Sequence, residues 1–117
     1  PPELLRTLLI RGRCCELYAM RKKLAAPDSF FTAGLFSRID ALMGDDLDFL
    51  IADLGLAADV GKAIAQFEGE VGAVLKAAIQ FDHGAWDEVS ADIDVALMVR
   101  CYSDAIMWCE KVTAAVR

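Results

Sequence analysis

The chain of 117 residues has the length of one domain, and 56% of its residues are hydrophobic, which is enough for a core. Its net charge of −6 argues against a nucleic-acid partner, because such binding relies on neutralising phosphates. No apolar run reaches the roughly 18 residues that span a bilayer, and no secretory signal is visible. We therefore expect a soluble cytoplasmic protein without a membrane partner. Since it opens with Pro1-Pro2 rather than methionine, we also expect a piece of a longer protein.

The charge is unevenly distributed along the chain. Residues 1–23 contain six basic and two acidic residues, a net charge of +4, so the remainder carries −10. Two interpretations are open. Either the basic residues form a solvated helix face, or the first helix docks on an acidic partner or on the acidic body of its own fold.

Apolar residues recur at helical spacing almost throughout, and no convincing strand alternation is present. Short connections imply antiparallel neighbours, so we predict an all-α, compact bundle of about six to seven helices over residues 1–117. In chain order, the predicted helices cover about 3–24, 29–43, 46–54, 58–67, 70–82, 85–93 and 96–116.

The first predicted helix ends before Pro27, because proline disfavours helical geometry in the residue before it. Its narrow apolar stripe consists of Leu5, Leu8, Gly12, Cys15 and Ala19. The last predicted helix carries a second stripe, made of Cys101, Ala105 and Trp108, with Tyr102 and Cys109 beside it. We expect the large aromatic side chains to anchor the core, namely Trp86, Tyr102 and Trp108.

Aspartate and glycine mark the predicted helix ends. Asp28 and Asp45 precede apolar segments, where a carboxylate can cap free amides. Gly61 and Gly72 lie within helical patterns and should permit close helix packing. The glycines that follow an apolar segment, where a left-handed residue is needed, are Gly44, Gly55, Gly69 and Gly84.

The four cysteines are expected to be reduced, buried thiols. None lies in a CxxC pair, and adjacent Cys14 and Cys15 make a poor zinc clamp. A bridge from either of them to Cys101 or Cys109 in the last helix has no support in the sequence.

Candidates for catalysis and metal binding are weak throughout. The single histidine, His83, lies at a predicted turn and cannot supply a zinc or iron site by itself. The acidic segment 44–55 lacks the sixth-position glycine and the twelfth-position glutamate of a calcium loop. We interpret its aspartates as residues at the start of a helix, where a negative charge complements the helix dipole. Ser37 has no flanking glycines of a nucleophile elbow, and residues 69–72 match a phosphate loop poorly. We therefore predict no catalytic, cofactor-binding or metal-binding residue.

Five short motifs together resemble the C-terminal part of an HDOD domain, the HD-related output domain, of the type fused to an EAL-like cyclic di-GMP phosphodiesterase domain. They are GL-x-S-x-x-D-AL-x-G at 34–44, LGL at 54–56, E-G-x-x-G at 68–72, G-x-W at 84–86 and Y-x-x-A-x-x-W at 102–108. The resemblance covers nearly the whole chain but implies that the N-terminal helices of the domain are absent. Apolar surface would then be left bare, so we expect either a homodimer or a self-contained bundle.

The resemblance bears directly on catalysis. HD phosphohydrolases carry a GLLHDIGK-like segment whose adjacent histidine and aspartate bind metal. On that pattern Ser37 takes the place of the histidine, Arg38 that of the aspartate and Asp40 that of the glycine. A hydroxyl is a poor ligand, and a permanently charged guanidinium repels a cation. Arg38 and Asp40 are then either candidate contacts or a solvent-facing pair.

The resemblance implies a non-catalytic signalling module that acts through protein partners, including an EAL-like domain in the same parent chain. Two alternatives are kept. One is a generic helical adaptor or oligomerisation domain without a nucleotide connection, and the other is a degenerate HD phosphohydrolase with residual activity.

Overall fold

The computed structural model describes residues 2–116, and over this range the chain is helical without any β-strand. The predicted all-α class is confirmed. The elements are α1 (Pro2–Arg21), α2 (Pro27–Phe36), α3 (Ile39–Met43), α4 (Leu47–Asp53), α5 (Ala58–Gln66), α6 (Gly69–Asp82), the 3-10 turn η1 (Trp86–Glu88) and α7 (Val95–Ala115). None of the helices in this range is both long and apolar enough to cross a bilayer.

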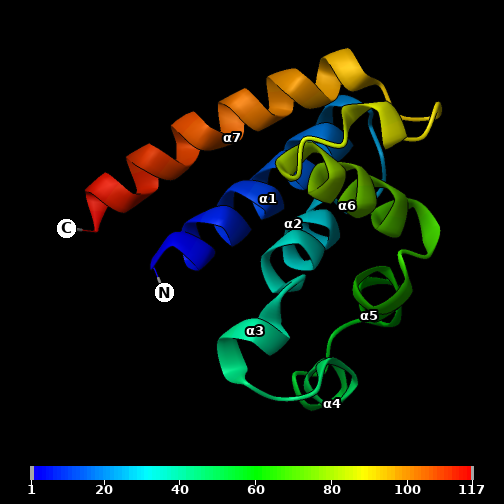
Figure 1. Ribbon diagram of the computed structural model, residues 1–117, viewed down its shortest axis with the longest axis vertical. Coiled ribbons are helices and arrows are strands. Elements are labelled where there is room, and N and C mark those ends of the chain that lie inside the picture. The colour runs from blue at the N-terminus through cyan, green and yellow to red at the C-terminus, as the bar shows by residue number, and fades with distance from the viewer. Residues whose placement is uncertain (1, 117) are drawn as a thin grey trace.

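Helix α1 lies at the centre of the bundle. It packs against α2, α6 and α7, while α5 packs against α6 and α2. Figure 1 shows α7 running alongside α1, with α3 and α4 at the opposite edge of the molecule. The large side chains that are almost completely buried come mainly from α1 and α7: Leu8, Cys14, Cys15, Phe30, Leu75, Met98, Cys101 and Cys109. Burial of such apolar side chains is the main driving force for the fold.

Two glycines allow α1 and α2 to touch backbone to backbone. A Cβ atom added to Gly34 would lie 2.5 Å from the Cα atom of Gly12. No flexible side chain stands there that could move aside, so both positions exclude larger residues. The sequence predicted Gly12 on a buried stripe but did not predict its pairing with Gly34. The two intrahelical glycines that were expected to permit close packing, Gly61 and Gly72, are buried against Ile51 and Phe67 respectively.

The predicted single helix over residues 29–43 is wrong, because it is broken at Ser37 and Arg38. Arg38 has φ −130° and ψ 34°, outside the helical region. Ser37 Oγ donates to the carbonyl of Gly34 at 2.8 Å. A serine that bonds to the backbone in this way competes with regular helical bonding, so α2 ends and α3 begins as a separate helix.

Three other local predictions are corrected. Residues 85–93 form only the turn η1, since the Ser90 hydroxyl accepts from the amide of Asp92 at 3.2 Å and favours a turn. Asp46, rather than Asp45, caps α4 by accepting from the amide of Phe49 at 3.3 Å. Asp28 caps nothing, because α2 starts one residue earlier, at a proline that is preorganised for a first turn.

Helix ends follow the glycine prediction with one exception. Gly44, Gly55 and Gly84 have positive φ angles and lie within two residues of the ends of α3, α4 and α6. Gly69 also has a positive φ, but the residue that caps the end of α5 is Phe67, a non-glycine residue with φ 57°. The chain therefore makes two left-handed steps between α5 and α6.

Two predicted core residues are exposed. Leu5 is 48% exposed near the start of α1, and Trp86 is 54% exposed on the turn η1, although the centroid of its ring lies 4.3 Å from that of Phe81. The other two predicted aromatic anchors, Tyr102 and Trp108, are partly buried and pack against the core as expected.

Candidate functional site

The most unusual buried group in the molecule is the guanidinium of Arg11. Arg11 lies on the inward face of α1, between Leu8 and Cys15, and is only 5% exposed. A permanently charged side chain in this position requires compensating partners, because removing a charge from water costs several kcal/mol. The partners come from two other helices.

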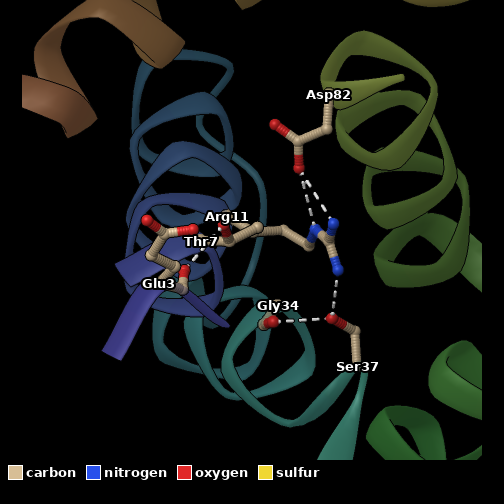
Figure 2. A network of polar contacts seen from close by, with 6 residues as sticks. All are labelled: Glu3, Thr7, Arg11, Gly34, Ser37 and Asp82. Atoms are coloured by element: carbon tan, nitrogen blue, oxygen red, sulfur yellow. Dashed lines mark hydrogen bonds and ion pairs between the residues drawn. The ribbon is translucent and has the colours of Figure 1, made fainter. Parts of the chain in front are cut away.

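Figure 2 shows the network that surrounds this guanidinium. Nε and Nη2 of Arg11 both donate to Oδ2 of Asp82, at 3.1 and 2.9 Å. Nη1 donates to Oγ of Ser37 at 3.0 Å. Ser37 Oγ in turn donates to the carbonyl of Gly34. The ends of α2 and α6 are thus tied to the middle of α1 through one cation.

The side chains of the network are largely shielded from solvent. The side chain of Asp82 is 10% exposed, and Ser37 is 8% exposed. Tyr102 from α7 borders the same site, and burial together with the neighbouring Asp82 carboxylate raises the pKa of Tyr102 to about 12. In such a low-dielectric setting the charge-assisted bonds of Arg11 are strong, and an unpaired member would be costly.

This geometry leaves Ser37 without the features of a nucleophile. Its hydroxyl proton is directed to a backbone carbonyl, and its oxygen accepts from a cation rather than from a base. A reactive serine needs a general base within hydrogen-bonding reach. The single histidine, His83, is exposed at the end of α6. The hydrogen bonds of Arg11 instead hold α1, α2 and α6 in fixed positions relative to one another.

Arg38 and Asp40 make no hydrogen bond or ion pair with the residues of this network. Their side chains are 56% and 40% exposed, and Nε of Arg38 lies 3.9 Å from Oδ1 of Asp40. Their exposure fits both interpretations left open for them, candidate contacts and a solvent-facing pair, and Oδ1 of Asp40 is itself buried without a hydrogen-bond partner. Of the three positions singled out from the HD-like segment, only Ser37 enters the interior.

Sequence reasoning missed Arg11 and Asp82. A signal for Arg11 was present, because it falls between Leu8 and Cys15 on the apolar face of α1, where a charge is rarely buried without a partner. No comparable signal marks Asp82, which follows Phe81 at the end of α6 and is separated from Arg11 by 71 residues.

The charge asymmetry is resolved within the fold. Three arginines of α1, together with Lys22 directly after it, form ion pairs with carboxylates of α6, of α7 and of the N-cap of α7. The basic helix thus docks on the acidic part of its own fold, as one of the two interpretations predicted. The pairs are Arg6–Glu110 at 3.9 Å, Arg11–Asp82 at 2.9 Å, Arg21–Asp104 at 2.6 Å and Lys22–Asp94 at 3.6 Å. Apart from Arg11–Asp82, these pairs are exposed and individually weak.

The four cysteines are free and buried, as predicted. The Sγ atom of Cys14 lies 3.5 Å from Sδ of Met98, within the contact of α1 with α7. Burial raises the pKa of Cys15 to about 12, so this thiol stays protonated at neutral pH and acts as a small apolar side chain. Over residues 2–116, histidines, cysteines and carboxylates do not gather into any group of three or more suited to a metal ion.

Comparison with known proteins relates the chain to two longer bacterial proteins. It is 28% identical over 116 residues to the uncharacterized protein YuxH of Bacillus subtilis (strain 168), a match that covers 97% of this chain and 28% of YuxH. It is 33% identical over 90 residues to the cyclic di-GMP phosphodiesterase CdgJ of Vibrio cholerae serotype O1, covering 76% of this chain and 21% of CdgJ. No family model matches the chain, and no solved structure matches it.

The chain therefore spans less than a third of the length of either relative. It is distantly homologous to a segment of a cyclic di-GMP phosphodiesterase.

Proposed function

We propose that this chain is a non-catalytic signalling module of the HDOD type, which acts through protein contacts in a cyclic di-GMP-related protein. The homology to a segment of CdgJ supports the link to cyclic di-GMP, and the ordered motifs from residue 34 to residue 108 support the HDOD assignment. One structural observation carries the non-catalytic part, namely the buried Arg11 network.

In the HD-like pattern, Ser37 stands where a metal-binding histidine would be. Here the Ser37 oxygen accepts a hydrogen bond from Arg11, whose charge is already balanced by Asp82. A divalent cation at this place would have to displace the Arg11 guanidinium, whose positive charge would repel it. The network thus gives the helix junction a structural role that requires no metal and no substrate.

A module without chemistry of its own works through contacts. In the longer cytoplasmic protein that we infer, the natural neighbour is an EAL-like domain, and the module would link the state of that domain to an output protein. Helices held together by one buried cation form a rigid body, which suits the transmission of a change in position.

Two measurements on purified protein test this proposal. The chain alone, supplied in turn with Mn²⁺, Fe²⁺ or Mg²⁺, should hydrolyse neither phosphomonoesters nor phosphodiesters. The longer natural protein should keep its rate of cyclic di-GMP hydrolysis, where it has one, when residues 1–117 are removed, but should lose an interaction partner in a pull-down.

The control for the first measurement is Ser37→Ala. Metal-dependent turnover that disappears in this variant would replace the proposal with a degenerate hydrolase. Unchanged partners after removal of the segment would also refute it.

A further inference from the structure

The edge of the molecule formed by residues 38–54 exposes an unusual amount of apolar surface. We call this region, which contains α3 and α4, the α3–α4 corner; it lies far from α7 (Figure 1). Each of its two helices buries one side chain, Ile39 in α3 and Leu50 in α4. Four large hydrophobic side chains stay exposed within 13 consecutive residues: Leu42 at 37%, Met43 at 59%, Phe49 at 57% and Leu54 at 44%.

A groove adjoins this apolar surface. It has a volume of about 240 Å³ and runs between α4 and α5, with Ile51, Leu56, Gly61 and Ala65 among its lining residues. Its charged lining residues are Asp48 and Lys62. An apolar groove with charged residues in its lining is the form that accepts the nonpolar face of an amphipathic helix.

The charge of the corner indicates what kind of helix would fit. Residues 38–54 contain five aspartates and one arginine, a net charge of −4. Arg38 is paired with Asp40. The remaining carboxylates belong to Asp45, Asp46, Asp48 and Asp53, and none of them has an ion-pair partner within residues 2–116. A basic partner would neutralise them, while an acidic one would be repelled.

A second copy of the chain does not meet this requirement. Each copy carries a net charge of −6, and the basic residues of its α1 are largely engaged by its own carboxylates. Self-association through the corner would bring unpaired aspartates close to an acidic body. The surface therefore favours a different protein over a dimer of this one.

We propose that the α3–α4 corner is a docking surface for a basic amphipathic helix of another protein. Its apolar face would cover Met43 and Phe49 and reach the groove beside α4, and its lysine or arginine residues would face the aspartates. This inference deepens the proposed function and rests on it, since it names the chemistry of a partner for a module that acts through contacts.

Site-specific photo-crosslinking in cells tests the surface directly. The longer natural protein receives a benzoylphenylalanine at Phe49 or, as the control, at Met107 of α7, a residue with the same exposed fraction of 57%. We expect at least a tenfold higher crosslink yield from position 49. The crosslinked peptide, sequenced by mass spectrometry, should come from another protein and carry lysine or arginine opposite apolar residues at helical spacing.

Three crosslinking results would overturn the inference: a crosslink to a second copy or to another part of the same polypeptide, a crosslink to an acidic or non-helical segment, and equal yields from the two positions. Failure here leaves the proposed function standing if the pull-down partner of the module is still lost on removal of residues 1–117. Hydrolytic activity of the module would instead refute the proposed function itself.

Binding of the crosslinked segment, synthesised as a peptide, provides the second test. Phe49→Ala should weaken the affinity for the peptide at least tenfold. The double variant Asp45→Asn with Asp53→Asn should also weaken it, and this loss should be larger at low salt than at high salt. Met107→Ala should leave it unchanged, and circular dichroism verifies that every variant is folded. Equal affinities for the Phe49 and Met107 variants would contradict the assignment.

Discussion

Helix α1 and the α3–α4 corner represent two opposite uses of apolar residues in one chain. Helix α1 is covered by α2, α6 and α7, and even its charged residue Arg11 is buried and fully paired. The corner has a similar supply of leucine, methionine and phenylalanine but buries only Ile39 and Leu50 of its two helices. Hydrophobic content alone therefore does not decide burial.

The two regions contribute differently to stability and to function. The Arg11 network fixes the helices that form the core, and short helices with little buried surface contribute little to stability. Residues in the corner are therefore free to serve a partner. Experiments can sharpen this contrast by perturbing each region in turn.

The largest effect is expected from Arg11→Met. This variant leaves the Asp82 carboxylate and the Ser37 hydroxyl buried without their partner, which should lower the free energy of unfolding by about 3–5 kcal/mol. Urea unfolding followed by circular dichroism measures it. The double variant Arg11→Met with Asp82→Leu should recover part of the loss, because no unpaired charge remains.

A loss below about 1 kcal/mol for Arg11→Met would show that the network is no more than a surface-type ion pair.

A smaller loss is expected where α1 crosses α2. Gly34→Ala places a methyl group against the backbone of Gly12, so it should cost about 1–3 kcal/mol or more, since neither backbone can move freely. Gly61→Ala is the matched control, because its added Cβ would meet a single side-chain atom, Cγ2 of Ile51 at 2.9 Å, and no backbone atom. Equal thermal shifts for the two variants would argue against the close crossing.

Alkaline pH should destabilise the core through its buried thiols. The folded pKa of Cys15 is raised by burial from 9.0 to about 12. Above pH 9 the unfolded chain loses this proton while the folded chain keeps it, so stability falls as pH rises. The slope is about 1.4 kcal/mol per pH unit for each such thiol.

Between pH 10 and 11, the stability of Cys15→Ala should therefore fall less steeply with pH than that of the parent, and the slopes should differ by about one proton. Parallel slopes for the two proteins would mean that Cys15 titrates normally in the folded state.

The smallest effect on stability is expected in the corner. Phe49→Ser should change the free energy of unfolding by less than about 0.5 kcal/mol, because the side chain is already in solvent. Amides of α3 and α4 should also exchange with deuterium well before those of α1 and α6. Slow exchange in the corner would show that it is as firmly held as the core.

Much of the fold could be predicted from the sequence, because helical periodicity and glycine positions specify most helix ends locally. The break at Ser37 could not be predicted in this way, since the Ser37 hydroxyl bonds back to the carbonyl of Gly34 while it accepts from Arg11, a residue 26 positions away. The same limit applies to the site. Arg11 was visible as a charge on an apolar face, whereas its pairing with Asp82 arises only when α1 and α6 pack.

In this structure a guanidinium, not a metal ion, holds the junction of α1, α2 and α6. Titration of isotopically labelled protein with Mn²⁺, followed by paramagnetic broadening in NMR spectra, tests it most directly. We expect signals of Arg11, Ser37 and Asp82 to stay sharp, with only weak, non-saturating broadening near the exposed aspartates of the corner. Selective, saturable broadening around Ser37 at a stoichiometric concentration of metal would contradict the account.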